Sequence, residues 1–236
     1  MCTRLLVLAF LLPVGAGAQL TFTKAKPPVI VTSANPTPQE SLAARELSDH
    51  LGKMIGVTIV PKSTNDPKPG SIVVGLASKW ADDKGLDPEE ILLRTKGGNL
   101  YVLGGGPRGT LYAVNRLLHR QGVRWWTPWA TQIPSKPKLQ FPAMSIREKP
   151  KFESRDPFWF HAFDRDWARR NASNSMHSQL SDQDGGKLVY DGFVHTFYPL
   201  VPPEKFFKSN PEWYSLIGGV RRVEGGQLCT TNQQLR

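Results

Sequence analysis

The chain has 236 residues, of which 39% are hydrophobic and 21% are charged, and its formal net charge at pH 7 is +10. These proportions are typical of a globular protein and exclude the intrinsically disordered and fibrous classes. The positive charge is concentrated between residues 107 and 151, where nine Lys and Arg stand against the single acid Glu148. Because these cations are scattered singly, we interpret them as a solvated basic face and expect no nucleic-acid partner.

Residues 1–18 have the pattern of a secretory signal peptide. Arg4 precedes an apolar run, and Ala16-Gly17-Ala18 offers small residues for cleavage. The run is too short to span a bilayer, and no later segment reaches the ~20 apolar residues of a transmembrane helix. We therefore expect an exported protein, periplasmic or extracellular after cleavage near Ala18, with no membrane span. Only Cys229 then remains, which we expect to be a buried apolar side chain outside any internal disulfide.

Residues 19–146 alternate between strand and helix patterns, which favours an α/β domain. One helix is expected to begin at Thr37, where a capping box coincides with Pro38, and to end at Gly56. A second helix is expected over residues 107–121, with Gly122 as its stop. Strands are expected over residues 29–31, 57–60, 71–75, 91–95, 101–103 and 123–126, with a hairpin at 96–99. Together these elements predict a mixed sheet that carries two helices.

The glycines of Gly104-x-Gly106-x-x-Gly109 stand between a strand and a helix, the order of a dinucleotide-binding turn. That interpretation fails because no Asp or Glu occurs from residue 107 to residue 147 to bind a ribose. No Gly-Lys-Ser/Thr follows the glycines, which excludes a nucleotide P-loop. We predict a structural turn, in which Gly109 lets the helix pack closely on the sheet, and we expect no cofactor.

Residues 147–236 are predicted to form a second domain. The proline- and lysine-rich stretch from Pro134 to Pro150 is typical of a connector between domains. Beyond it the sequence is rich in aromatic residues and less regular. We expect strands over residues 152–160 and 173–180, a helix over 164–170, and helical turns at 203–205 and 231–232.

The block GGGPRGTLYAVNRLLHRQGVRWWTP, residues 104–128, resembles the non-catalytic N-terminal domain shared by bacterial α-glucuronidases and β-N-acetylhexosaminidases, of glycoside hydrolase families 67 and 20. The matching positions include Arg108, Gly109 and Tyr112, followed by Arg124 and Trp125. Residues 192–219 and the QLCTTN segment at 227–232 resemble the family called domain of unknown function 4838. The resemblance implies a glycoside-hydrolase-like protein, whose N-terminal α/β domain supports a (β/α)₈ barrel that carries the chemistry.

A complete barrel of this kind needs ~250 residues. We therefore expect residues 147–236 to form only the first βα units of an incomplete (β/α)₈ barrel. The chain is expected to be a truncated, inactive fragment, and the resemblance implies catalytic carboxylates beyond its C-terminus.

Five residues are candidates for substrate binding in that domain, since active sites gather at the strand ends of such barrels: Arg155, Asn171, Asn174, His195 and Trp213. Each has a structural alternative. Arg155 can form an ion pair with a neighbouring aspartate, and the two asparagines can serve in turns. His195 can be a hydrogen-bonded core histidine, and Trp213, like Trp159 and Trp167, can belong to the core.

A catalytic pair of carboxyl groups would mark a glycosidase. Aspartates cluster after the connector, but caps and salt bridges are favoured for them over catalysis: Asp156, Asp164, Asp166, Asp182 and Asp184. The spacing of the histidines at 161, 177 and 195 matches no metal-ligand motif, so we expect no metal. The sequence thus predicts an exported glycoside hydrolase that acts on oligo- or polysaccharides, and the alternative is a non-catalytic glycan-binding module. It makes no prediction of oligomeric state.

Overall fold

The computed structural model describes residues 20–81 and 85–235, and the predicted signal peptide lies outside them. The chain divides into two compact units between Leu188 and Val189. Residues 147–188 therefore group with the first unit, although the sequence assigns them to the second predicted domain. In the part of the chain that the structure describes, no helix is long and apolar enough to cross a membrane.

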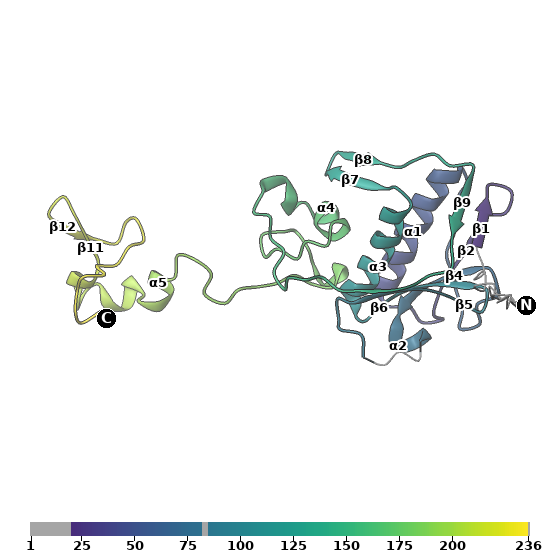
Figure 1. Cartoon of the computed structure of the whole chain (residues 1–236). Helices are drawn as coiled ribbons and strands as arrows, with labels where there is room; N and C mark the ends of the chain where they lie inside the picture. Colours follow the sequence, from purple (N-terminus) through teal and green to yellow (C-terminus); the bar gives the residue numbers. More distant parts are fainter. Residues whose placement is uncertain (1–19, 82–84, 236) are drawn as a thin grey trace, which may run out of the picture. The chain divides into compact units, whose positions relative to one another are not determined.

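The first unit is built on a six-stranded mixed sheet with the order β10-β5-β6-β4-β2-β3 (Figure 1). Strands β2, β3, β4 and β6 run parallel, whereas β5 is antiparallel to both β6 and β10. The bounds are Val29–Thr32 for β2, Lys62–Ser63 for β3, Ser71–Leu76 for β4, Ile91–Lys96 for β5, Asn99–Gly104 for β6 and Ser145–Glu148 for β10.

Four of the predicted strands are confirmed in this sheet, as β2, β4, β5 and β6. The hairpin at residues 96–99 is also confirmed, since Lys96 pairs with Asn99 at the turn. The strand predicted over residues 57–60 is wrong. The N–H of Val57 donates to the Gly52 carbonyl at 3.0 Å, which uses this stretch to close the turn after the first helix. The parallel ladder therefore begins only at Lys62.

Two helices, α1 (Pro38–Ile55) and α3 (Pro107–Arg120), lie side by side on one face of this sheet, and the short α2 (Ala77–Trp80) lies on the other face (Figure 1). The predicted capping box is confirmed. The Thr37 hydroxyl accepts from the Glu40 N–H, the Glu40 carboxylate accepts from the Thr37 N–H, and Gly56 ends α1 at a φ of 69°. Pro38 and Pro107 each begin a helix, as the sequence predicts.

The core follows from the alternation of side chains along the strands. Ile91 and Leu93 of β5 pack in the main cluster with α1 and α3, whereas Leu92 between them packs with Ala77 and Leu103 on the opposite face. Because both faces of the sheet are covered, its central strands are almost continuously apolar.

The connector predicted over residues 134–150 is wrong, because this stretch contains two strands. β9 (Lys138–Phe141) pairs antiparallel with β1 (Leu20–Thr23), and β10 extends the main sheet. The four prolines lie outside both strands, while Leu139 and Phe141 alternate into the core. The strand predicted over residues 123–126 is confirmed as β7 (Arg124–Thr127), which pairs with β8 (Ala130–Gln132) outside the main sheet.

No strand occurs from Lys149 to Tyr214, all of which the structure describes, so the strands predicted over residues 152–160 and 173–180 are wrong and the incomplete barrel is not confirmed. A positive φ angle at Phe158 (45°) interrupts extended backbone in the first of these stretches, and another at Ala172 (55°) lies just before the second. The predicted helix over residues 164–170 is confirmed: α4 (Arg165–Arg170) is capped by Asp164 and lies between the 3₁₀ turns η1 (Phe160–Phe163) and η2 (Asp182–Asp184).

The second unit, residues 189–235, is small. Its short elements are α5 (Phe197–Leu200), α6 (Pro203–Phe206), η3 (Pro211–Trp213) and the hairpin of β11 (Ser215–Ile217) with β12 (Val220–Arg222). Tyr214 is fully buried in it and packs against the rings of Tyr198 and Phe207.

The helical turn predicted at residues 203–205 is confirmed by α6, but residues 231–232 form no helix. The backbone there is already engaged, since the Cys229 N–H donates to the Trp213 carbonyl and the Asn232 N–H donates to the Cys229 carbonyl. Cys229 is partly exposed, which corrects the expected burial, and hydrogen bonds with Thr231 and Arg221 lower the pKa of its thiol.

Candidate functional site

The glycine turn before α3 is filled by the chain itself. The N–H of Gly105 donates to the Glu90 carbonyl at 2.9 Å, and the N–H of Gly109 donates to the Pro88 carbonyl at 3.2 Å. A Cβ atom on Gly105 would lie 2.0 Å from the Asp87 carbonyl oxygen. Residues 87–90 therefore occupy the space in which a dinucleotide-binding turn would hold its phosphates, and the structural interpretation of the glycines is confirmed.

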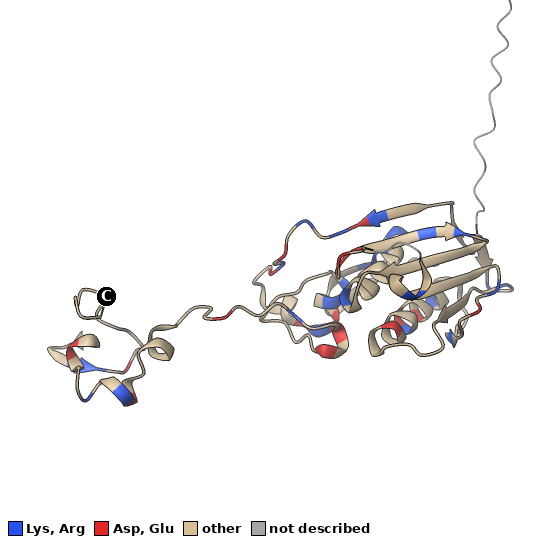
Figure 2. Cartoon of the chain, turned by 90° about the horizontal axis from the view of Figure 1, so that it is seen from below, with Lys and Arg blue, Asp and Glu red and all other residues tan. Residues whose placement is uncertain are grey.

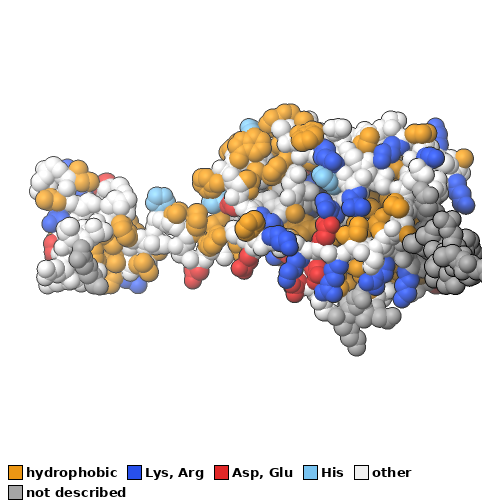
Figure 3. Space-filling model, in the orientation of Figure 1, with side chains coloured by type: hydrophobic (Ala, Val, Ile, Leu, Met, Phe, Trp, Pro, Cys, Tyr) orange, Lys and Arg blue, Asp and Glu red, His pale blue; other side chains and the backbone are white. Residues whose placement is uncertain are grey.

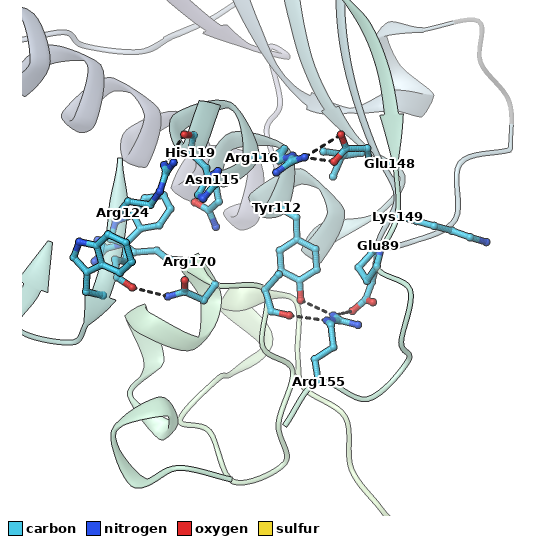
Figure 4. Close-up of a pocket in the computed structure, with 16 residues that line it drawn as sticks. Glu89, Tyr112, Asn115, Arg116, His119, Arg124, Glu148, Lys149, Arg155 and Arg170 are labelled. Carbon is cyan, nitrogen blue, oxygen red and sulfur yellow. Dashed lines mark hydrogen bonds and ion pairs between the residues drawn. The ribbon is translucent and has the colours of Figure 1, made fainter. Parts of the chain in front are cut away.

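A pocket of about 630 Å³ lies beside this turn, between α3, β7 and the chain that follows β10 (Figure 4). Trp125 and Trp126 form part of its wall, and Tyr112 and Asn115 enter from α3. Charged side chains supply much of the rest. Five are cationic and two are carboxylates: Arg116, Arg124, Lys149, Arg155 and Arg170 against Glu89 and Glu148.

Of the predicted binding residues, the structure brings Arg155 and Asn171 together in this pocket. The Asn171 amide donates to the carbonyls of Trp125 (3.3 Å) and Trp167 (3.1 Å), which ties α4 to β7. Asn174 is not among the residues that line the pocket. It is buried, its amide donates to the Glu153 carbonyl at 2.7 Å, and its carbonyl oxygen accepts from the Arg155 N–H at 2.9 Å.

His195 and Trp213 belong to the second unit. His195 is exposed and has a φ of 52°, within the left-handed region. Trp213 packs against Phe206, with 5.7 Å between ring centroids. The sugar-binding roles of all five candidates stay predictions.

Arg155 is held by the chain on every side. Its Nε donates to the Ala172 carbonyl at 2.6 Å, and Nη1 donates to the carbonyls of Phe152 and Glu153. Its Nη2 donates to Glu89 at 2.8 Å and to the Tyr112 hydroxyl at 3.1 Å. Since a guanidinium has five N–H donors, all of them have partners here. Burial lowers the pKa of Arg155, but the bonds to Glu89 and Tyr112 outweigh it and raise the pKa overall.

We expect Arg155→Lys to lower the free energy of unfolding by about 2 kcal/mol, because an ammonium cannot reproduce the planar fork that joins Ala172, Glu89 and Tyr112. The segment after β10 then loosens from α3, so limited proteolysis should cut it faster. Arg94→Lys is the control, because it makes the same Arg-to-Lys substitution at a different place, on β5. Equal proteolysis of the two variants would contradict the structural role.

The clustered aspartates serve as caps and ion-pair partners, which confirms the structural interpretation. Asp164 accepts from the Trp167 N–H, and Asp166 pairs with Arg169 at 2.9 Å. Asp156 accepts from the Phe158 N–H and lies 3.0 Å from the ring nitrogen Nδ1 of His177. Among residues 20–81 and 85–235, no three His, Cys, Asp or Glu side chains gather as metal ligands.

Asp184 is the most enclosed of these carboxylates. Burial by itself raises its pKa, but hydrogen bonds from the Ser181 N–H and from Arg165 and Arg169 outweigh it and hold the pKa below its usual value. The pKa values of Glu40 and Asp156 are lowered in the same way, by bonds that outweigh burial. A general acid of a glycosidase needs the opposite shift.

These lowered pKa values predict a loss of stability in acid. Carboxylates with depressed folded-state pKa values stabilise the fold above their unfolded-state pKa of about 4, and this contribution is lost as the pH falls through the folded-state values. The melting temperature should therefore fall from pH 5 to pH 3, measured by circular dichroism. Asp156→Asn should make the fall shallower, whereas Asp66→Asn, which removes an exposed pair, should not. An unchanged melting temperature over this range would contradict the assignment.

Apart from Arg155 and Asn171, the residues that line the pocket were not chosen from the sequence as binding residues, among them His119, Arg124 and Trp126. Two features of the sequence pointed toward these residues. Arg124 belongs to the motif that carries the family resemblance, and Lys and Arg are frequent after residue 107. Only the packing of β7 against α3 shows that these side chains border the same space.

Comparison with known proteins gives two family matches. Residues 13–117 match the family model described as glycosyl hydrolase family 67 N-terminus, and residues 125–236 match the model described as domain of unknown function (DUF4838). No curated protein matches the chain significantly.

Three similar solved structures are glycosidases. A GH115 4-O-methyl-α-glucuronidase, BtGH115A, is 20% identical with a TM-score of 0.44, and the match covers 54% of this chain and 18% of that one. A GH20 exo-β-N-acetylglucosaminidase from Vibrio harveyi is 19% identical with a TM-score of 0.39, and the match covers 58% of this chain and 18% of that one. A GH20 β-N-acetylhexosaminidase from Streptomyces coelicolor A3(2) is 18% identical with a TM-score of 0.38, and the match covers 59% of this chain and 25% of that one.

The matched region thus spans a quarter or less of the length of these enzymes. The two family models match the families that the sequence motifs resemble, and they follow one another along the chain. The chain therefore joins a stretch similar to the glycosyl hydrolase family 67 N-terminus to a stretch similar to DUF4838.

Proposed function

We propose that this protein is exported and acts on oligo- or polysaccharides as a glycoside hydrolase, and that the pocket beside α3 holds the glycan. The match of residues 13–117 to a glycosyl hydrolase N-terminal family carries this proposal. The pocket fits a sugar chain because it combines indole surface from Trp125 and Trp126 with the amides of Asn115 and Asn171. Ligand sites commonly pair apolar walls with a few polar groups of this kind.

Hydrolysis would be carried out by carboxyl groups other than those that line this pocket. Glu89 is paired with Arg108 and Arg155, and Glu148 is paired with Arg116. A glycosidase needs one carboxyl group that donates a proton and a second that acts as base or nucleophile. We therefore assign no catalytic role to Glu89 or Glu148, and their engaged state favours a non-catalytic glycan-binding module as the second candidate.

A glycan array with the full chain tests binding, and release of reducing sugar from each bound glycan tests hydrolysis. We expect binding to at least one oligosaccharide, weakened in Trp126→Ala but retained in Trp129→Ala. Both side chains are exposed tryptophans, but only Trp126 lines the pocket. Binding without hydrolysis would support the second candidate, and the absence of any glycan binding would contradict both.

Export is tested separately by N-terminal sequencing of the protein recovered from the periplasm or the medium. The expected first residue is Gln19, after cleavage behind Ala18. A mature protein that begins at Met1 would contradict export by this route.

A further inference from the structure

A second depression adjoins the pocket along the C-terminal half of α3 and has a volume of about 770 Å³. The charged side chains that line it are all cationic: Arg116, Arg120, Arg124, Lys136 and Lys138. It shares Arg116, His119 and Arg124 with the first pocket, so the two form one continuous basic groove. Figure 3 shows Lys and Arg side chains gathered on the face of the first unit that carries α3.

Lys149, Arg155 and Arg170 of the first pocket are paired with Asp87, Glu89 and Glu46. Most of the positive charge that lines the second depression, by contrast, has no carboxylate partner among the described residues. Arg116 is the exception, since it pairs with Glu148 at 2.8 Å. Arg124 donates to two backbone carbonyls at 2.7 Å, those of His119 and Val123, and Lys136 donates to the side-chain carbonyl of Gln121 at 3.1 Å. For Arg120 and Lys138 the structure gives no ion pair with any residue in 20–81 or 85–235. The basic groove therefore carries uncompensated positive charge.

The positive charge of the basic groove contributes to a lowered pKa of His119, which lines both pockets. Burial first, and then the positive charges of Arg124 and Arg116, lower the pKa of His119. The histidine is therefore neutral at pH 7, and the cations around it are the groups that would attract an anion. Such clusters in a concave surface focus the electrostatic potential and concentrate anionic ligands.

We propose that the basic groove binds an acidic glycan, a chain of sugars that carry carboxylate groups. The groove is elongated over two pockets, which suits several consecutive sugar units rather than one small anion. Arg120 and Arg124 provide planar guanidinium forks that match carboxylates, and Trp126 offers an apolar surface at one side for a sugar face. This proposal rests on the proposed function, and it adds the charge class of the glycan.

The test compares an oligogalacturonate with its methyl ester, which has the same sugar backbone without the negative charge. Titration calorimetry of the full chain at ~20 mM NaCl should show at least a 10-fold preference for the acid, and ~200 mM NaCl should reduce that preference, since exposed charges are screened. Arg120→Gln with Lys138→Gln should weaken binding of the acid by about 5-fold or more and leave binding of the ester unchanged.

The matched control removes two exposed lysines elsewhere, Lys24→Gln with Lys62→Gln, and so makes the same change in net charge. It should leave the affinity for the acid within about 2-fold of the unaltered protein. An equal loss in both double variants would overturn the groove as the binding site, because net charge alone would then explain the attraction.

Two further outcomes separate this proposal from the one on which it rests. Equal affinity for acid and ester would overturn the acidic preference and leave glycan binding intact. Failure of every glycan, neutral or acidic, would overturn the proposed function. A DNA duplex of ~20 base pairs that binds more tightly than the oligogalacturonate at the same ionic strength would overturn the choice of a glycan as the polyanion.

Discussion

Gly105→Ala is expected to lower the free energy of unfolding of the first unit by about 3 kcal/mol, because the added Cβ would lie 2.0 Å from the Asp87 carbonyl oxygen. That oxygen belongs to the backbone of the segment that fills the glycine turn, so no side-chain rotation relieves the contact. The Gly105 N–H also bonds to the Glu90 carbonyl, so a shift of either segment breaks that bond. Chemical denaturation followed by tryptophan fluorescence measures the loss.

Gly97→Ala is the control for this substitution. Gly97 has a φ of 58° and no atom within 4 Å of the added Cβ, so its cost is that of a left-handed alanine, about 1 kcal/mol. Comparison of the two variants distinguishes the cost of a steric contact with residue 87 from the cost of a left-handed backbone conformation. If Gly105→Ala destabilised the protein no more than Gly97→Ala, residues 87–90 would not be packed on the turn as described.

Arg169→Met is expected to lower the free energy of unfolding by about 3 kcal/mol. Arg169 is only 5% exposed and lies 2.7 Å from Glu46 on α1 and 3.0 Å from Asp184, whose side chain is fully buried. Removing one partner of a buried ion pair leaves the other charge without compensation in a poorly solvated place. Arg165 and Arg170 retain contacts with Asp184 and Glu46, which keeps the loss at the lower end of the range for such pairs.

Lys53→Met is the matched control, since its partner Asp49 and Lys53 itself are both more than half exposed. It should change the free energy of unfolding by no more than about 0.5 kcal/mol. Figure 2 shows the acidic (red) and basic (blue) residues along the ribbon of the first unit. Similar losses in the two variants, measured by urea denaturation, would contradict a buried network that fastens α4 to α1.

The elements whose signals are local were predicted from the sequence. Thr37, Pro38 and Gly56 act through bonds within one turn of α1, so their residue types alone determine where it begins and ends. The hairpin at residues 96–99 is equally local. The sequence alone also excluded the dinucleotide interpretation, because it has no Asp or Glu from residue 107 to residue 147 that could bind a ribose.

The predictions after residue 133 failed where the outcome depends on partners distant in the chain. Residues 138–141 form a strand because β1 lies alongside them, and residues 145–148 because β5 does. Conversely, the aromatic stretch over residues 152–160 has no neighbouring strand in the described chain, and its backbone is held by single bonds from side chains such as Asn174. A sequence pattern of period two cannot distinguish these cases.

The sequence by itself determined the α/β character of the first unit, the ends of its helices, the structural role of the glycines and the two family resemblances, because each depends on residue types at short separations. Only the tertiary structure decided that Arg155 fastens three segments and that the scattered cations of α3, β7 and β9 border one groove. The reason is physical: side chains that are far apart in the sequence come to share a surface only when a sheet and its helices bring their backbones together.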